Sequence, residues 1–163
     1  MIAEPVIVLL VEDDPAHAEI VRRNFVNFRM ANRPVQLEHV ADGQDALDYL
    51  FSRGKFQNPG QSPRPNLILL DLRLPKVDGL EVLKIIKADA DLASIPVVVL
   101  TTSSAEADVA KAYENHASSY LVKPMDFSQF NKLMEALGFY WLAWNQYSKT
   151  GGVSYSQQPP FRP

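Results

Sequence analysis

The chain has 163 residues, of which 47% are apolar, and this length and composition favour one domain with a sizeable core. A formal net charge of −3 gives no overall basic footprint for nucleic acid, and the lack of cysteine excludes disulfides and thiolate metal sites. No apolar run approaches the roughly 20 residues that cross a bilayer. We therefore expect a cytoplasmic protein that binds neither nucleic acid nor a membrane.

Five short apolar runs rich in Val, Ile and Leu alternate with longer segments of helical period, and a polar turn follows each run. This alternation is typical of a parallel sheet that is covered by helices on both faces. Only the run at 35–40 alternates between polar and apolar residues, which favours an edge position for it. The expected strands are, in chain order, Val6–Val11, Val35–Val40, Leu67–Leu70, 96–101 and Ser119–Val122.

A helix is expected after each strand. Asp14 and Asp78 are suitable caps for the first and third helices, and Glu81 would complete a capping box with Asp78. Five such β–α units predict an α/β fold with a doubly wound, five-stranded parallel sheet, which binds ligands beyond the carboxyl ends of its strands. The helices should begin near Pro15, Gly43, Gly79, Ser104 and Asp126, with Ser103 or Ser104 capping the fourth.

Two stretches depart from this alternation. Residues 52–65 contain three prolines and two glycines, and we interpret them as an exposed surface loop, with a binding element as the alternative. Toward its end the chain becomes rich in Gly, Ser, Gln and Pro, which is too poor in apolar side chains to pack. The sequence therefore predicts a single domain over residues 1–147 and a disordered C-terminal tail over 148–163.

Carboxylates follow two of the expected strands. The triplet Glu12-Asp13-Asp14 ends the first strand and Asp71 ends the third, and a doubly wound sheet can place these strands side by side. Crowded carboxylates repel one another unless a cation neutralises them, and a hard divalent ion with oxygen ligands, most naturally Mg²⁺, would do so. The alternative role of helix cap suits Asp14, which precedes a proline, but not Glu12 or Asp13.

Asp71, Thr101 and Lys123 follow the third, fourth and fifth expected strands. Taken singly, each has an ordinary interpretation: a turn former, a β-branched filler and a solvated charge. Together with the acid pair, however, they supply what phosphoryl transfer needs, namely a nucleophile and positive charge to offset the phosphoryl oxygens. We therefore predict a phosphoryl-handling site in which these three residues carry the chemistry.

Four motifs at these strand ends resemble the receiver domains of two-component signalling. They are LLVEDDP at 9–15, LDLRLP at 70–75 with DG at 78–79, TTS at 101–103 and YLVKP at 120–124. The resemblance covers roughly residues 5 to 140. It implies a flavodoxin-like receiver domain fold and a phospho-accepting response regulator, with a sensor histidine kinase as its partner.

The resemblance also implies a set of metal and phosphate ligands. Asp71 would be the phosphoacceptor, and Asp13 with Asp71 would bind Mg²⁺ directly. The backbone carbonyl of Arg73 and, through water, Glu12 would complete the metal site. Asp14 would be the adjacent, less essential acid.

A switch is implied on the other side of the site. Thr101 would be drawn toward the phosphoryl group, and Tyr120 would then turn inward. Lys123 would offset the negative charge of the phosphoryl oxygens. A plain half-buried strand aromatic is the competing interpretation of Tyr120. By the same resemblance, Pro124 would follow a cis peptide.

A narrower resemblance links the chain to the small response regulators of bacterial and cyanobacterial phytochromes. It rests on the long loop at 52–65, the phrase LASIP at 92–96 and the aromatic run FYWL at 139–142. The sensor kinase would then be a phytochrome. After the last expected helix, no room is left for a DNA-binding or enzymatic output module, so we expect the output to be binding. We expect no enzymatic activity beyond phosphotransfer to the protein itself and slow autodephosphorylation.

Two other functions stay open at this stage. An aspartyl-phosphate phosphatase or phosphotransferase shares the Asp nucleophile and Mg²⁺, but it needs a second acid two residues after the nucleophile, where this chain has Arg73. A degenerate receiver that never carries phosphate is disfavoured because every core residue is present.

The last expected helix indicates association. Its apolar residues form one stripe that the domain's own core can bury, but four further apolar residues, Phe127, Phe139, Tyr140 and Leu142, fall largely off it. Exposed aromatics of this kind mark interfaces, so we expect a homodimer through Phe139, Tyr140 and Trp141. The alternative is that the helix folds back against residues 52–65 within one chain.

Overall fold

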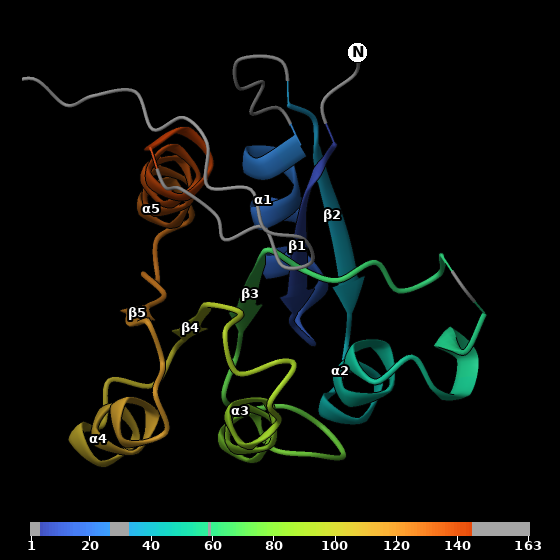
Figure 1. The fold of residues 1–163 in the computed structure, drawn as a ribbon. Coiled ribbons are helices and arrows are strands. Elements are labelled where there is room, and N and C mark those ends of the chain that lie inside the picture. The colour runs from blue at the N-terminus through green and yellow to red at the C-terminus, as the bar shows by residue number, and fades with distance from the viewer. Residues whose placement is uncertain (1–3, 27–32, 59, 145–163) are drawn as a thin grey trace, which may run out of the picture.

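A computed structural model describes residues 4–26, 33–58 and 60–144, and within them the chain forms one parallel five-stranded sheet (Figure 1). The strand order β2-β1-β3-β4-β5 is that of a flavodoxin-like, doubly wound sheet, as predicted. Strand β2, in which polar and apolar residues alternate, lies at an edge of the sheet, which confirms its predicted position. The strands are β1 Val6–Val11, β2 Val35–Val40, β3 Leu67–Leu70, β4 Val97–Thr101 and β5 Ser119–Val122.

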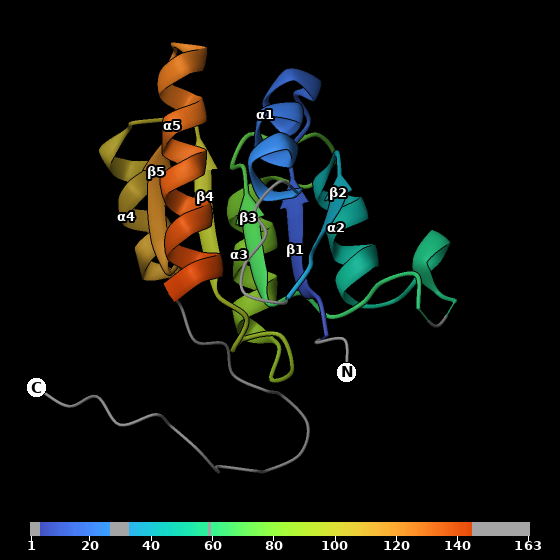
Figure 2. The same ribbon diagram turned by 90° about the horizontal axis from the view of Figure 1, so that it is seen from above.

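Five helices cover the two faces of the sheet (Figure 1). Helices α1 and α5 lie side by side on one face, and α2, α3 and α4 lie on the other (Figures 1 and 2). A π-helical segment, Phe139–Trp144, continues α5. The helices are α1 Pro15–Val26, α2 Gly43–Leu50, α3 Gly79–Ala88, α4 Glu106–Glu114 and α5 Phe127–Gly138.

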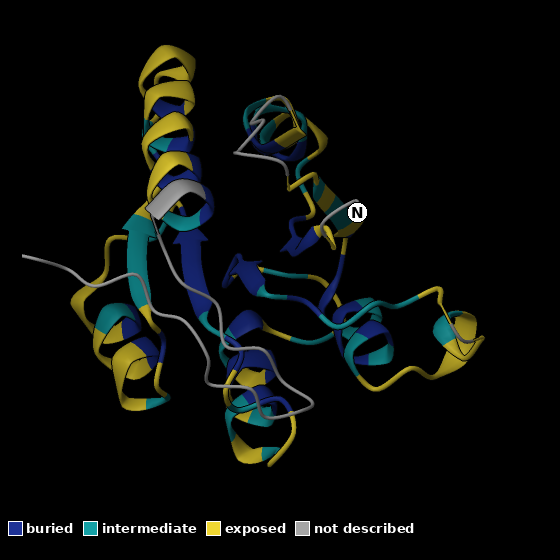
Figure 3. Ribbon diagram, turned by 45° about the horizontal axis from the view of Figure 1, so that its top comes forward, coloured by how far each residue is buried: buried dark blue, intermediate teal, exposed yellow. Residues whose placement is uncertain are grey.

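Successive side chains of each strand point to opposite faces of the sheet and pack into two apolar layers. The central strands are buried on both faces (Figure 3). In β1, Leu9 and Val11 pack toward α2, α3 and α4, whereas Val8 and Leu10 pack toward α1 and α5. This burial explains why β1, β3 and β4 are continuous apolar runs in the sequence. It also leaves the carboxyl ends of the strands as the place where polar side chains can gather.

The strand register sets which ends meet. Val11 pairs with Leu70, so the residues that follow β1 and β3 are neighbours. On the other side, Thr101 pairs with Val122, and the Lys123 amide donates to the Thr101 carbonyl at 2.7 Å. The carboxyl ends of β1, β3, β4 and β5, which the sequence singled out, therefore lie side by side at one end of the sheet.

Some local expectations were wrong. Helix α4 begins at Glu106 and not near Ser104, because the Ser103 hydroxyl accepts a hydrogen bond from the Ala105 amide and donates to Asp108, which holds the preceding residues in a turn. Asp78 makes no side-chain capping hydrogen bond, so its capping box with Glu81 is not formed. The described residues contain no cis peptide, so the peptide before Pro124 is trans.

The excursion at 52–65 packs beside α2. It contains a 3-10 turn at Gly54–Phe56, the Tyr49 hydroxyl donates to the Pro63 carbonyl at 2.8 Å, and the rings of Tyr49 and Phe56 meet edge to face. This segment lies on the opposite side of the domain from α5 (Figure 2), so it does not cover the aromatic end of that helix. The predicted tail at 148–163 lies outside the described residues. Among those residues, no helix has the length and apolar character needed to cross a membrane.

Gly79 sets how closely α3 approaches the strand end that carries Asp71. A Cβ added at Gly79 would lie 2.1 Å from the Asp71 carbonyl oxygen and 2.5 Å from the Leu72 Cα. Both are backbone atoms, so relief requires α3 to shift.

We expect Gly79→Ala to lower the free energy of unfolding by roughly 1–3 kcal/mol, the usual cost of overpacking. Urea denaturation is the measurement, and Glu81→Ala, an exposed change two residues along α3, is the control, with an expected effect below about 0.5 kcal/mol. Equal stability of Gly79→Ala and the parent would contradict this close approach.

Candidate metal and phosphoryl site

Three carboxylates come together where β1 and β3 end. Glu12 is buried, with 1% of its surface exposed, Asp71 is buried and Asp13 is exposed. One oxygen from each of them lies within 4.8 Å of the others. Hard oxygen ligands at this spacing suit a divalent cation such as Mg²⁺ or Mn²⁺, so the residues present fit the metal site predicted from the sequence.

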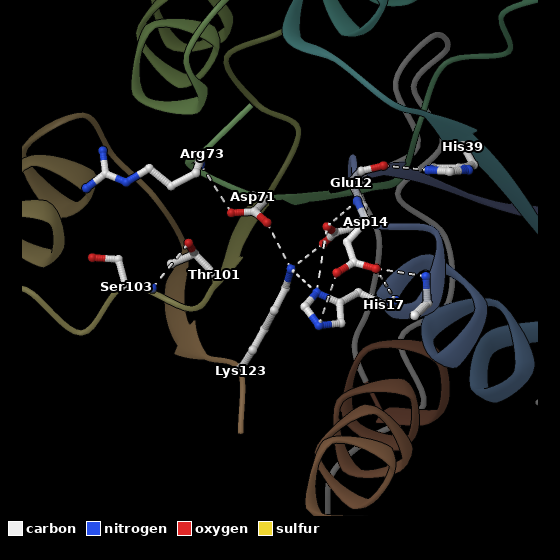
Figure 4. Close-up of polar contacts among 10 residues, drawn as sticks. Glu12, Asp14, His17, His39, Asp71, Arg73, Thr101, Ser103 and Lys123 are labelled. Carbon is white, nitrogen blue, oxygen red and sulfur yellow. Dashed lines mark hydrogen bonds and ion pairs between the residues drawn. The ribbon is translucent and has the colours of Figure 1, made fainter. Parts of the chain in front are cut away.

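Lys123 reaches this cluster from the end of β5 (Figure 4). Its buried ammonium donates to Glu12 Oε2 and to Asp71 Oδ2, the latter at 2.8 Å. A third contact joins Lys123 Nζ to His17 Nδ1 at 3.1 Å. The predicted ammonium and the predicted phosphoacceptor are thus in direct contact.

Burial in the domain raises the pKa of Glu12 to about 7. Desolvation of the carboxylate is the main cause, and it outweighs the hydrogen bond and the charge of Lys123, which lower the pKa. The charge of Asp71 raises it further. The protonation of Glu12 therefore changes near neutral pH.

Asp14 plays a different part from its two neighbours. Its Oδ1 accepts hydrogen bonds from the Ala16 and His17 amides at 2.9 and 3.3 Å, and so it caps α1. It does not belong to the group of three carboxylates. The helix-cap interpretation holds for Asp14, as the sequence suggested.

The two predicted switch residues, Thr101 and Tyr120, both bond to the backbone of Ser103. Thr101 is fully buried, and its Oγ1 accepts a hydrogen bond from the Ser103 amide at 3.5 Å. The Tyr120 hydroxyl donates to the Ser103 carbonyl at 2.8 Å, and Tyr120 is half-buried. A displacement of Thr101 would therefore act on the residue that also holds the Tyr120 hydroxyl.

Arg73 turns its side chain away from the carboxylates (Figure 4). Its guanidinium bonds to Asp108 of α4 at 2.6 Å, and its backbone amide donates to Asp71 Oδ1 at 3.2 Å. Asp108 also accepts from the Ser103 hydroxyl at 2.6 Å. The backbone of Arg73 thus lies beside the predicted phosphoacceptor, Asp71, and its carbonyl is predicted to bind the metal. The side chain of Arg73 is bonded to α4.

The sequence analysis did not identify His17 or Asp108 as part of this neighbourhood. It named Ser103 only as a possible helix cap and missed that the Ser103 carbonyl accepts from the Tyr120 hydroxyl. His17 had a usable signal, because it stands three residues after the cap Asp14 on the first turn of α1, close to the strand end. Asp108 had none, because an acid in the first turn of a helix is ordinary. Its contact with Arg73 depends on how α4 packs against the sheet.

The predicted interface residues differ in exposure. Phe139 and Tyr140 are 52% and 58% exposed, whereas Trp141 is half-buried against the layer shared by α1 and α5. The rings of Tyr140 and Trp141 meet edge to face with centroids 5.5 Å apart. Leu142 is buried in the same layer, which corrects the expectation that it would be surplus to the core.

The raised pKa of Glu12 predicts how stability changes with pH. The pKa is 4.5 for an ordinary glutamate and about 7 in the folded chain, so the contribution of Glu12 to stability is fully present below pH 4.5 and is lost as the pH rises through about 7. Urea denaturation in EDTA between pH 5 and pH 8 should show the parent losing stability relative to Glu12→Gln. Parallel curves for the two proteins would contradict the assignment.

Comparison with known protein families finds a match to the response regulator receiver domain over residues 8–135. The chain is 46% identical over 143 residues to the probable methanogenesis regulatory protein FilR2 of Methanothrix harundinacea, with 88% of each protein covered. It is 43% identical over 138 residues to the response regulator Rcp1 of Synechocystis sp., covering 85% of this chain and 90% of Rcp1.

Solved structures agree with this match. The Mn²⁺-bound form of Rcp1 superposes with a TM-score of 0.83 at 41% identity, covering 89% of this chain and all of that one. The phosphorylated cyanobacterial phytochrome response regulator RcpA superposes with a TM-score of 0.81 at 36% identity, covering 89% of this chain and 99% of that one. With its fold, its motifs and its strand-end cluster in agreement, the chain belongs to the response regulator receiver domain family.

Proposed function

We propose that the protein is a phosphorylation-operated response regulator in which Asp71 accepts a phosphoryl group from a phosphohistidine of a sensor kinase. The observation that carries this proposal is the contact of the Asp71 carboxylate with the buried Lys123 ammonium inside a group of three carboxylates. A carboxylate held against a fixed cation and near further metal-binding oxygens has the parts of a phosphoryl acceptor.

Mg²⁺ is the proposed metal. Asp13 and Asp71 would bind it directly, with the Arg73 carbonyl, and Glu12 would act through water. When bound, the ion offsets the negative charge of the phosphoryl oxygens. The clustered carboxylates and the Mn²⁺-bound form of the relative Rcp1 support a divalent ion here, and the preference of Mg²⁺ for carboxylates together with phosphate oxygens favours it among such ions.

The chain's own groups divide the reaction among themselves. An Asp71 oxygen forms the new bond to phosphorus, and the bond from phosphorus to the kinase histidine breaks. Lys123 neutralises charge that develops on the phosphoryl oxygens, from a position already fixed before the reaction. The resulting acyl phosphate attracts the Thr101 hydroxyl, and the shared contact at Ser103 passes this movement to Tyr120.

A phytochrome is the proposed sensor kinase. The supporting observation is the likeness, over about nine tenths of the chain, to RcpA, which is named as a phytochrome response regulator. We propose that the protein signals by binding, in the cytoplasm, and that its catalysis is limited to phosphotransfer to itself and slow autodephosphorylation. Arg73 in place of a second acid argues against the phosphatase alternative.

Dimerisation through the end of α5 is proposed as the output. Phe139 and Tyr140 expose large aromatic surfaces next to the half-buried Trp141, and Phe127 at the start of α5 is 62% exposed. Aromatic side chains contribute strongly to the centres of protein interfaces. Among the described residues, the excursion at 52–65 does not cover this surface, and we propose a second copy of the chain as its partner.

Phosphorylation at Asp71 is tested by intact mass spectrometry after incubation with acetyl phosphate, with and without Mg²⁺. We expect one added phosphoryl group in the presence of Mg²⁺, and none for Asp71→Asn, because an amide oxygen is a far weaker nucleophile than a carboxylate. Asp78→Asn, an exposed change in the loop that follows, is the matched control and should be modified like the parent. Parent-level modification of Asp71→Asn would reject the assignment.

The proposed dimer is tested by light scattering at micromolar concentration on the intact chain and on Phe139→Ser combined with Trp141→Ser. The intact chain should have the mass of a dimer, and the double variant should lose it because the aromatic centre of the contact is gone. Each measurement is repeated with beryllium fluoride and Mg²⁺ as a phosphoryl mimic. A monomeric mass for the intact chain in both states would leave a monomeric regulator as the output form.

A further inference from the structure

His17 contacts both the site and the helix that carries the proposed output surface. It lies on the first turn of α1, where Nδ1 is 3.1 Å from Lys123 Nζ (Figure 4). The same ring meets the ring of Phe130 of α5 edge to face, with centroids 5.5 Å apart. None of the roles assigned above uses this residue.

The Lys123 ammonium has three protons and three acceptors, which come from three different parts of the fold. Glu12 follows β1, Asp71 follows β3 and His17 belongs to α1. An ammonium can only donate, so His17 Nδ1 must accept and the ring proton lies on Nε2. Nε2 is 3.7 Å from Asp14 Oδ2, and Nδ1 is 3.9 Å from Glu12 Oε1.

The three acceptors differ in what else they bind. Glu12 and Asp71 belong to the group of carboxylates that fits a divalent cation, and Asp71 is also the proposed phosphoacceptor. His17 lies outside that group and contributes a ring nitrogen. It is therefore the acceptor that can hold the ammonium in place while the carboxylates have other partners.

We propose that His17 is a positioning residue for phosphorylation: Nδ1 fixes the Lys123 ammonium, and the ring passes changes at that contact to α5 through Phe130. This inference rests on the proposed function of Asp71 and extends it.

The path from His17 into α5 is direct. Phe130 is buried in the layer shared by α1 and α5, and the two helices are joined further by a hydrogen bond from Asn24 to Asn131 at 2.8 Å. Trp141 and Leu142 pack in the same layer, 11 and 12 positions after Phe130 along α5 and its continuation. This route does not pass through Thr101 and Tyr120.

Two substitutions separate the two contacts of His17. His17→Asn keeps a hydrogen-bond acceptor close to the place of Nδ1 but removes the ring that meets Phe130. His17→Phe keeps a ring but removes the acceptor. His116→Asn is the matched control, because this histidine is exposed and has a φ of +66°, a backbone conformation that asparagine tolerates.

The first measurement is the initial rate of phosphorylation of the full chain by acetyl phosphate with Mg²⁺. His17→Phe should be slower by roughly tenfold, the loss expected for one hydrogen bond to a charged group. His17→Asn and His116→Asn should stay within about threefold of the parent. Mg²⁺ affinity, measured by calorimetry without a phosphoryl donor, should be unchanged in all three variants, because His17 is not a proposed metal ligand.

The second measurement follows α5 by fluorine NMR of chain labelled with 5-fluorotryptophan, with the Trp141 signal assigned by Trp141→Phe. Addition of beryllium fluoride and Mg²⁺ should shift this signal in the parent and in His116→Asn. In His17→Asn, the shift should be lost although phosphorylation is retained, since the ring contact with Phe130 is gone.

The outcomes distinguish this inference from the proposed function. A parent chain that takes up no phosphoryl group overturns the function of Asp71, and with it the role of His17. A modified parent with an equal rate in His17→Phe overturns the positioning role alone. An unchanged Trp141 response in His17→Asn, or no response in the parent, overturns the link to α5.

Discussion

The buried contact of the Lys123 ammonium with Glu12 and Asp71 is the constraint on which the arrangement of the site depends. Removing an ammonium from water costs several kcal/mol unless well-placed acceptors compensate it. Here the ammonium follows β5, and its carboxylate acceptors follow β1 and β3. The compensation is available only when three strand ends are held in one register, so the site is an outcome of the completed sheet and not of any local motif.

The sheet satisfies this requirement through its order. Strands β1 and β3 are neighbours, so Glu12 and Asp71 lie side by side, and β4 separates β3 from β5. At the end of β4 stands Thr101, whose carbonyl accepts from the Lys123 amide and so fixes the start of the lysine side chain. The same strand end therefore holds the proposed switch hydroxyl and anchors the lysine that contacts the proposed phosphoacceptor, Asp71.

Two groups of contacts lead away from this centre. On the β4 side, Ser103 joins Thr101 to Tyr120, and Asp108 joins Ser103 to Arg73 and thereby to the loop after β3. On the α1 side, His17 leads to Phe130 and α5. Each group of contacts includes a donor to Asp71, namely the Arg73 amide on the β4 side and the Lys123 ammonium on the α1 side. We propose these as two routes by which a change of charge on Asp71 reaches the surface of the domain.

Much of this could be predicted from the sequence because of how parallel sheets bury their strands. Strands β1, β3 and β4 are buried on both faces and so appear as unbroken apolar runs, and their ends mark where Glu12, Asp71 and Thr101 must stand. Helix α4 was predicted to begin near Ser104 but begins at Glu106. The Ser103 hydroxyl bonds to Asp108 and to the Ala105 amide, which holds the residues before the helix in a turn. The contact of His17 with Phe130 joins side chains from two helices far apart in the chain, so it has no local signature in the sequence.

Asp71 is the residue proposed to form the acyl phosphate. Reduction with sodium borohydride converts an aspartyl phosphate into homoserine with loss of phosphate, and so marks the modified residue permanently. After incubation with acetyl phosphate and Mg²⁺, peptide mapping by tandem mass spectrometry should find homoserine at position 71, and none when EDTA replaces Mg²⁺. Homoserine at position 13, or at no position, would contradict this role of Asp71.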